Sequence, residues 1–142
     1  MMMKISRSDI TYINQVPPKF PEGSYVAYDL EAWTTKEDAK RLHRPVGEFA
    51  CFSVTDDGHN VYVITELENL QETVNNMEDC IWIAQNAAYD IRQISRWITI
   101  PRVQEHFCTM AFDRVLWGGF FNNFSLIVSV SALNSLDNFL LL

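Results

Sequence analysis

The sequence lacks the features that usually mark a disulfide-rich, zinc-binding or triphosphate-binding protein. Its three cysteines, Cys51, Cys80 and Cys108, are widely spaced and contain no C-x-x-C pair, so we expect no disulfide framework. Its three histidines show no ligand spacing, which counts against zinc. Gly118-Gly119 is followed by no Lys-Ser or Lys-Thr, so it predicts a turn rather than a phosphate loop. We therefore expect reduced thiols and a cytoplasmic protein.

Long apolar runs are also scarce. Residues 1–21 contain no continuous apolar segment, so no signal peptide is expected ahead of the domain. The one membrane-like stretch, residues 124–142, contains Asn134, Asp137 and Asn138. These polar side chains would be costly in lipid, so the stretch predicts a buried amphipathic helix and no membrane partner.

The chain contains few positively charged residues. The chain has 11 Lys and Arg against 18 Asp and Glu, which gives a formal net charge of −7 at pH 7. This balance counts against a protein that holds nucleic acid mainly through its phosphates. It does not exclude an enzyme whose acidic site is neutralised by bound cations. A basic cluster (Lys36, Lys40, Arg41 and Arg44) favours a solvated loop over phosphate contacts.

What is present fits one globular domain, since 48% of the 142 residues are hydrophobic and 13% aromatic. We expect an N-terminal arm over residues 1–23 and the folded domain over residues 24–142. Apolar runs, three- and four-residue stripes and turn residues predict the elements of this domain. The strands are expected at residues 24–30, 48–54, 60–64, 80–84 and 102–108, and the helices at residues 67–77, 90–97, 110–116 and 125–136. This order predicts a three-layer α/β fold with a mixed sheet.

The first motif that suggests chemistry is the triplet Asp29-Leu30-Glu31, at the end of the first predicted strand. Residues i and i+2 of a strand share a face, so both carboxylates project together while Leu30 points away. Two adjacent anions raise each other's pKa unless a cation lies between them, and Mg²⁺ prefers carboxylate oxygen. Taken alone, the triplet is common, and two solvated acids at a strand end are the simpler interpretation.

A second polar cluster follows the apolar strand predicted at residues 80–84. Asp90 falls near the start of the next predicted helix, where free amide groups and the helix dipole favour an anion. A simple N-cap explains Asp90 by itself. It does not explain Asn86, Ala87 and Ala88 just ahead of it, at the kind of strand end where α/β folds place ligands. The two clusters together indicate a metal site.

Both clusters carry a family resemblance. Residues 28–31, Tyr-Asp-Leu-Glu, resemble the first motif of the DEDD superfamily of 3′–5′ exonucleases, which includes the proofreading domains of family A DNA polymerases. Residues 86–90, Asn-Ala-Ala-Tyr-Asp, resemble its second motif, with Gln85 in place of the frequent His. Residues 107–110 resemble a later Asp-Thr-Met segment, with Cys in place of Asp. Residues 123–126 resemble the Ser-Leu start of the following family helix.

The resemblance implies a ribonuclease H-like fold and two-metal cleavage of phosphodiester bonds, with Mg²⁺ or Mn²⁺ as the cofactor. It makes Asp29 the ligand of both ions, Glu31 a ligand of one, and Asp90 the group that completes the outer coordination. Five further residues would contact the substrate or orient the site: Leu30, Ala32, Trp33, Asn86 and Tyr89. Trp33 could stack on a base. For Trp33, packing on the core is an equally good alternative.

The third motif of the family, a Tyr or His followed by a metal-binding Asp, has no counterpart. Asp113 has neither residue at the required offset, and Asp137 is preceded there by Leu133 and Ala132. Three explanations stand: a C-terminally truncated exonuclease or polymerase, a variant that has lost catalysis but still binds, or an acid supplied by a neighbouring chain. The apolar residues 139–142 favour truncation and would promote self-association.

The sequence therefore predicts a metal-dependent 3′–5′ exonuclease domain acting on single-stranded DNA ends, of phage or polymerase proofreading type. RNA stays open as a substrate, and a polymerase or a second copy is the expected partner. The alternative is a catalytically inactive nuclease-fold module that binds nucleic acid or a protein. A third interpretation is an unrelated α/β domain in which both motifs are accidental.

Overall fold

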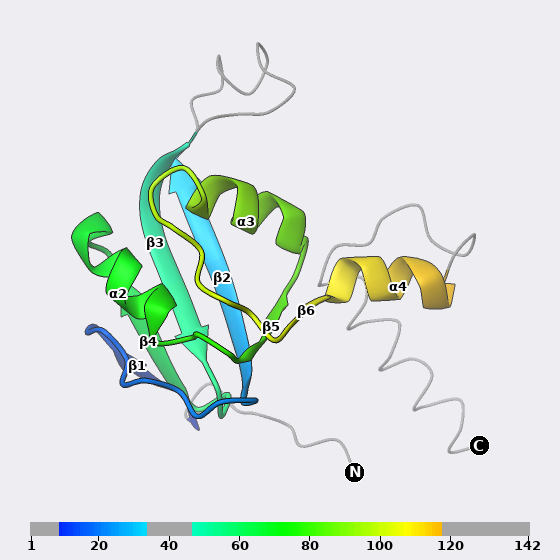
Figure 1. Cartoon of the computed structure of the whole chain (residues 1–142), viewed down its shortest axis with the longest axis horizontal. Coiled ribbons are helices and arrows are strands. Elements are labelled where there is room, and N and C mark those ends of the chain that lie inside the picture. The colour runs from blue at the N-terminus through cyan, green and yellow to red at the C-terminus, as the bar shows by residue number, and fades with distance from the viewer. Residues whose placement is uncertain (1–8, 34–46, 118–142) are drawn as a thin grey trace.

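Six strands form one mixed sheet in the computed structural model, which describes residues 9–33 and 47–117 (Figure 1). The strand order is β1-β4-β3-β2-β5-β6. Strand β2 lies inside the sheet, antiparallel to β3 and parallel to β5. The strands are β1 (Thr11–Ile13), β2 (Tyr25–Trp33), β3 (Glu48–Thr55), β4 (Asn60–Ile64), β5 (Ile81–Ala84) and β6 (Glu105–Cys108).

The helices of the described residues are short. They are the 3₁₀-helix η2 (Leu67–Asn69) and the α-helices α2 (Leu70–Asn75), α3 (Ala87–Ile94) and α4 (Thr109–Trp117). Figure 1 shows α3 lying over β2, whereas α4 lies beyond β6, to the side of the sheet. Within the described residues, no helix is long and apolar enough to cross a membrane.

Strand β2 shows which face of the sheet carries the core. Val26, Tyr28 and Leu30 are buried, and the residues between them, among them Ala27 and Asp29, are exposed. This alternation has the period of two that strands require. The buried face packs against α2 and α3, through a single cluster of apolar side chains that includes Phe52, Leu70, Val74, Trp82 and Ile94.

The predicted elements are confirmed with small shifts in their bounds, and the strand over residues 60–64 is found as predicted. Strand β2 runs three residues further than expected, so that Trp33 still belongs to it. Strand β1 was not predicted: it lies in the segment expected to be an arm and pairs in parallel with β4. Three residues are too few to show an alternating pattern. The helix expected over residues 125–136 lies outside the described residues.

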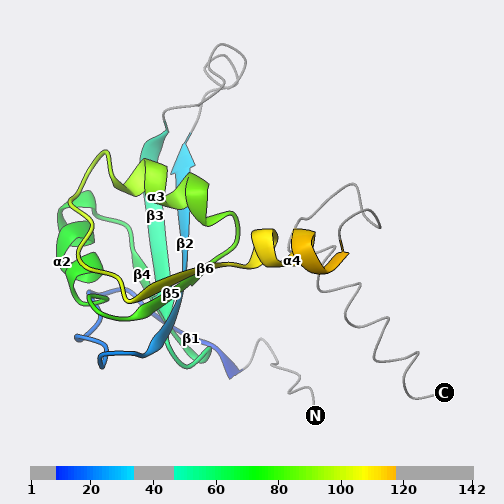
Figure 2. The same cartoon turned by 45° about the vertical axis from the view of Figure 1, so that its right-hand side comes forward.

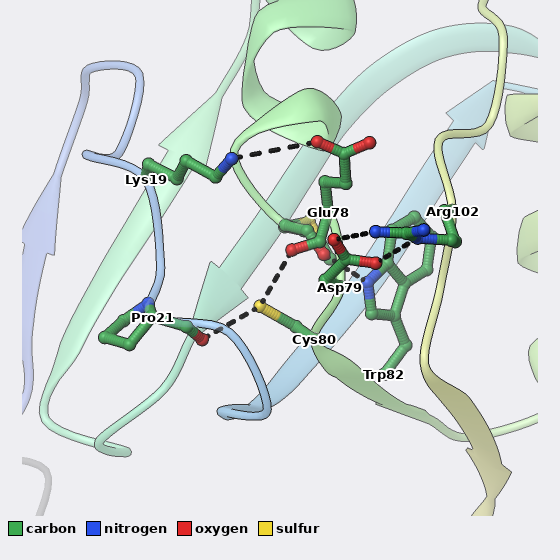
Figure 3. A network of polar contacts seen from close by, with 8 residues as sticks. Lys19, Pro21, Glu78, Asp79, Cys80, Trp82 and Arg102 are labelled. Carbon is green, nitrogen blue, oxygen red and sulfur yellow. Dashed lines mark hydrogen bonds and ion pairs between the residues drawn. The ribbon is translucent and has the colours of Figure 1, made fainter.

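A turn before β5 joins three segments that are distant in the sequence (Figure 3). Asp79 adopts a positive φ of 58° there, and its carbonyl accepts the N–H of Gly23 at 2.9 Å. Its carboxylate pairs with Arg102, with Nη2 to Oδ2 at 2.7 Å. The buried Trp82 indole donates to the Met77 carbonyl at 2.8 Å. These contacts tie the N-terminal segment and the segment before β6 to the end of the sheet remote from Asp29.

The hairpin between β3 and β4 allows a first test of the local structure. The Asp57 carboxylate accepts the N–H groups of Asn60 and His59, both at 2.7 Å, and these bonds lower its pKa to about 2. Asp57→Ala is therefore expected to reduce the free energy of unfolding at pH 7 by about 1 kcal/mol, the usual contribution of such bonds at an exposed site. Urea denaturation measures this, with exposed Asp56→Ala as the control.

The pH dependence of that difference has a definite sign. Because the folded pKa of Asp57 lies below its ordinary value of 3.8, the carboxylate stabilises the protein above pH 4. The difference between wild type and Asp57→Ala should shrink as the pH falls from 4 towards 2. A difference that stays constant as the pH falls from 4 to 2, or one that grows on acidification, would contradict this account.

Candidate functional site

Asp29 and Glu31 lie on the exposed face of β2, opposite the core, as the strand period predicts. In the register with β3, Asp29 faces Ser53 and Glu31 faces Cys51. The register shifts immediately after Glu31, because β3 carries one extra residue, Ala50, at this point. Such a bulge increases the local twist and redirects side chains, and bulges are frequent beside active sites. The irregular part of the sheet therefore coincides with the acid pair.

Asp90 approaches the same point from the helix side. It lies in the first turn of α3, only 2% exposed, and its carboxylate accepts the backbone N–H of Leu30. Its pKa is raised to about 7, first because burial disfavours the charged form and then because the charges of Asp29 and Glu31 repel it. The bond from Leu30 opposes this shift without cancelling it. The structure thus brings all three predicted acids within electrostatic reach of one another.

Asn86 shapes the start of α3. It is the N-cap residue, with φ 53° and ψ 43°, and it is exposed. Its side chain makes no capping hydrogen bond, while its carbonyl accepts the N–H of Tyr89 at 2.8 Å. Asn adopts this left-handed conformation more readily than most residues with a Cβ, because its short polar side chain can bond locally. The alternative that Asp90 is a simple N-cap is wrong, since Asn86 holds that position and Asp90 is one turn further along.

The three acids have the chemistry of divalent-metal ligands, but their side chains are not arranged around an ion. All are hard oxygen donors of the kind that Mg²⁺ prefers. A buried carboxylate whose pKa is raised by two like charges is a group that a cation would ionise and stabilise. Within residues 9–33 and 47–117, however, no three His, Cys, Asp or Glu side chains are arranged to hold an ion as they stand. Holding a cation would therefore require the acid side chains to move closer together.

The residues expected near a substrate fall into two groups. Trp33 is 74% exposed, and by strand alternation it shares the face of Asp29 and Glu31. The alternative that Trp33 packs on the core is therefore wrong. Leu30, in contrast, is 3% exposed, and its side chain belongs to the core. Only its backbone reaches the site, through the hydrogen bond to Asp90.

The other two expected contacts lie at intermediate depth. Ala32 and Tyr89 are both partly buried. The pKa of Tyr89 is raised by burial and then by the charges of Asp90 and Glu31, which places its hydroxyl near the acids. Tyr89 thus lies on the same side of the site as Asp90 and Glu31.

Two further features escaped sequence reasoning. Cys51 faces Glu31 across the strand pair, and burial, then Glu31 and Asp29, raise the pKa of its thiol. On the core side, the buried Tyr28 hydroxyl lies 2.7 Å from Nε2 of His106, and burial lowers the pKa of that imidazole. Both pairings join residues from separate strands. Only a known strand order and register could have revealed them.

The sheet and its helices define the fold class. The mixed sheet with flanking helices is the predicted α/β fold of the ribonuclease H-like type. No family model matches the chain, and no curated protein matches it.

Among solved structures the chain is similar in fold to Brucella melitensis NrnC. The NrnC structure with bound Mg²⁺ has a TM-score of 0.59 and 15% identity over 87% of this chain. Another NrnC structure gives 0.59 and 17% identity over 86% of this chain, covering 58% of NrnC. The structure bound to pGG gives 0.52 and 15% identity over 81% of this chain, covering 53% of NrnC. The chain thus spans at most 60% of the length of these neighbours.

Proposed function

We propose that this protein is a metal-dependent exonuclease domain that removes nucleotides from the 3′ ends of single-stranded nucleic acid. The observation that carries the proposal is Asp90, a buried carboxylate whose ionisation is opposed by Asp29 and Glu31 and would be favoured by a bound cation. The fold neighbours support it, because one contains Mg²⁺ and another contains pGG. The finer assignment to a polymerase proofreading type rests on the motif resemblance alone.

In this proposal each acid has a distinct part. Asp29 would hold two Mg²⁺ ions, Glu31 would hold one of them, and Asp90 would complete the coordination from the helix side. The ions would supply activation of water and stabilisation of the leaving 3′ oxygen. The chain itself positions the acids: Leu30 orients Asp90 through its N–H, and α3 keeps that carboxylate away from bulk water. Asn86 is exposed at the same edge and would orient a bound nucleotide.

The experiment is a cleavage assay with 5′-labelled single-stranded DNA and RNA of equal sequence, with Mg²⁺, Mn²⁺ or EDTA. A ladder of products shortened from the 3′ end, abolished by EDTA, is the expected result. A substrate blocked by a 3′-phosphate should be degraded more slowly, and internal cleavage should be absent. Intact substrate under all metal conditions would contradict the enzymatic proposal, and the comparison of DNA with RNA identifies the preferred sugar.

A second candidate is a nuclease-fold module that binds without cleaving. It is favoured by the arrangement of the acids, since within the described residues no three of them are placed to hold an ion. Fluorescence anisotropy with a labelled oligonucleotide separates the two candidates. Saturable binding that is unaffected by Mg²⁺, together with an intact substrate, would select the binding module. Binding that strengthens with Mg²⁺ and leads to cleavage would select the exonuclease.

Trp33 provides a prediction about substrate contact. If its exposed indole stacks on a base near the acids, Trp33→Ala should weaken substrate binding by about 1–3 kcal/mol, which is about 5- to 150-fold. The substitution should raise KM while changing kcat little, because stacking stabilises the bound substrate and the transition state equally. Tyr25→Ala is the matched control, because Tyr25 is an exposed aromatic residue on the same face at the other end of β2. Equal effects of both substitutions would contradict a specific contact.

A further inference from the structure

The outer side of helix α3 carries two exposed arginines, Arg92 and Arg96, which we call the arginine pair. Arg92 lies in the last turn of α3, and Arg96 follows in the turns that continue the helix. Figure 2 shows α3 in front of the sheet, with no other described helix or strand over it. Residues four apart on a helix are neighbours on one face, about 6 Å apart along its axis. Both guanidinium groups therefore project from the same solvated side of α3.

The charge of the arginine pair is not compensated by its surroundings. The protein as a whole is acidic, with a formal net charge of −7 at pH 7. Two other cations have acidic partners, since Lys19 pairs with Glu78 and Arg102 pairs with Asp79. Within residues 9–33 and 47–117, the arginine pair forms no ion pair with any acid. An external anion can therefore bind these two cations without displacing an acid of the described residues.

Packing fixes the end of α3 that carries the arginine pair. Trp97 directly follows Arg96 and contacts Phe49 of β3 edge to face, with ring centroids 5.7 Å apart. The N–H groups of Arg96 and Trp97 donate to carbonyls of α3, at 3.1 and 2.9 Å. Phe49 is paired with Ala32 in the register of β2 and β3, and Ala32 directly follows Glu31. The arginine pair is therefore held at the same end of the sheet as the acids.

Helix α3 also connects the arginine pair to the acid cluster. Asp90 lies in the first turn of this helix, and exposed Ala88 starts the outer row that continues with Arg92 and Arg96 at intervals of four residues. Six residues separate Asp90 from Arg96, which corresponds to about 9 Å along the axis. About three nucleotides cover this length, even at the stacked spacing of about 3.4 Å per nucleotide. A strand whose end lies at the acids can therefore reach the arginine pair.

We propose that the arginine pair binds phosphates of the substrate strand a few nucleotides upstream of the 3′ end held at the acids. This inference rests on the proposed function and adds to it the path of the substrate. Each guanidinium presents a planar fork of N–H donors that can bind a phosphate through two hydrogen bonds. Phosphate contacts position a strand but do not read its bases. The arginine pair thus supplies affinity for nucleic acid without sequence preference, and offsets the repulsion between the strand and an acidic protein.

A purely structural role is the alternative for these arginines. Arg92 is the basic residue in the last turn of α3, where a cation interacts favourably with the helix dipole. Such a role would change the free energy of unfolding when the charge is removed. It would leave the salt dependence of nucleic acid binding unchanged, so the two roles can be separated by experiment.

Fluorescence anisotropy on the full chain tests the inference, with a labelled single-stranded hexanucleotide, several salt concentrations and EDTA to prevent cleavage. Each phosphate contact contributes about 0.7 to the slope of log affinity against log salt for single strands. In the double variant Arg92→Gln/Arg96→Gln, the slope should therefore be smaller in magnitude by about 1.4, and affinity at about 0.1 M salt should fall about tenfold or more. The loss should be equal for oligo-dA and oligo-dT. It should be absent with a dinucleotide, which is too short to reach from the acids to the arginine pair.

Further variants control for folding and for net charge. Gln is a good helix former, so α3 should persist in the double variant, and circular dichroism checks this. Arg92→Lys/Arg96→Lys keeps both charges and should retain most of the salt slope. Lys19→Gln removes the same charge as Arg96→Gln, but at the network near the remote end of the sheet (Figure 3). It should leave the affinity within about twofold, as is usual for distant surface substitutions.

The outcomes separate this inference from the proposed function. If the wild type binds the hexanucleotide and Arg92→Gln/Arg96→Gln binds it with the same affinity and salt slope, the inference is overturned and the proposed function stands. A loss of equal size with the dinucleotide would also overturn the inference, because the arginines would then act at the acids and not upstream. If the wild type binds no oligonucleotide with either EDTA or Mg²⁺, both the inference and the proposed function fail.

Discussion

Asp29→Asn is expected to lower the rate of Mg²⁺-dependent cleavage by at least about 10²-fold, the usual scale for losing one group that stabilises developing charge. Asn keeps the size and shape of Asp but removes the charge that would hold two cations. Asp29 is exposed and has no part in the core cluster, so the fold should survive the change. Single-turnover cleavage of a labelled oligonucleotide measures the rate, and circular dichroism confirms the fold.

The control for Asp29→Asn is Asp56→Asn, which removes one carboxylate from an exposed turn at the far end of the hairpin. It changes the net charge of the protein by the same amount and should leave the rate within about twofold, as is usual for distant surface substitutions. A comparable loss in both variants would indicate that net charge, and not a specific site, controls the activity. Full activity in Asp29→Asn would remove the acid pair from the mechanism.

Strand and helix positions could be predicted because they follow from local patterns. The alternation of Val26, Tyr28 and Leu30 with exposed residues identified both the strand and the face on which Asp29 and Glu31 lie. The same reasoning recovered β4, whose bounds follow directly from its apolar run after the Asp-Gly turn. Local periodicity is sufficient to predict an element when one side of that element is buried and the other is exposed to solvent.

The parts of the site that depend on distant pairing could not be predicted. Cys51 faces Glu31 because of the antiparallel register of β2 and β3, as the last pair before the register shifts. Asp90 is buried because α3 begins at Ala87 and lies across β2, which brings its carboxylate to the N–H of Leu30. The sequence indicated three acids near one another. It could not indicate that one of them is largely desolvated.

That desolvation leads to the second large effect, on stability. The folded pKa of Asp90 is about 7, whereas the ordinary value is 3.8. Between these two pH values the folded state holds a proton that the unfolded state has released. The contribution of this carboxyl to stability is therefore fully present below pH 3.8, declines as the pH rises towards 7, and is lost above it.

Asp90→Asn removes this penalty in the absence of divalent cations. Asn can still accept the N–H of Leu30 but carries no charge to desolvate. At pH 8 with EDTA, the variant should be more stable than the wild type by about 2–4 kcal/mol. Each unit of pKa shift corresponds to about 1.4 kcal/mol, and part of the shift of Asp90 belongs to its coupling with Asp29. Near pH 4 the two proteins should have similar stability. Urea denaturation from pH 4 to pH 8 measures the difference.

Adding Mg²⁺ should make the wild type more stable than Asp90→Asn. A cation that binds the ionised acids in the folded state stabilises the wild type in proportion to the logarithm of its concentration, and this gain should be lost in Asp90→Asn. Glu72→Gln, at an exposed acid of α2, is the control and should follow the wild type throughout. If Asp90→Asn were less stable than the wild type at pH 8 with EDTA, the buried acid would be a structural anion. If Mg²⁺ stabilised both proteins equally, the cation would bind elsewhere. The predicted combination, a carboxylate that destabilises the free protein and stabilises it once a cation is bound, is what a metal site requires and what a structural acid does not show.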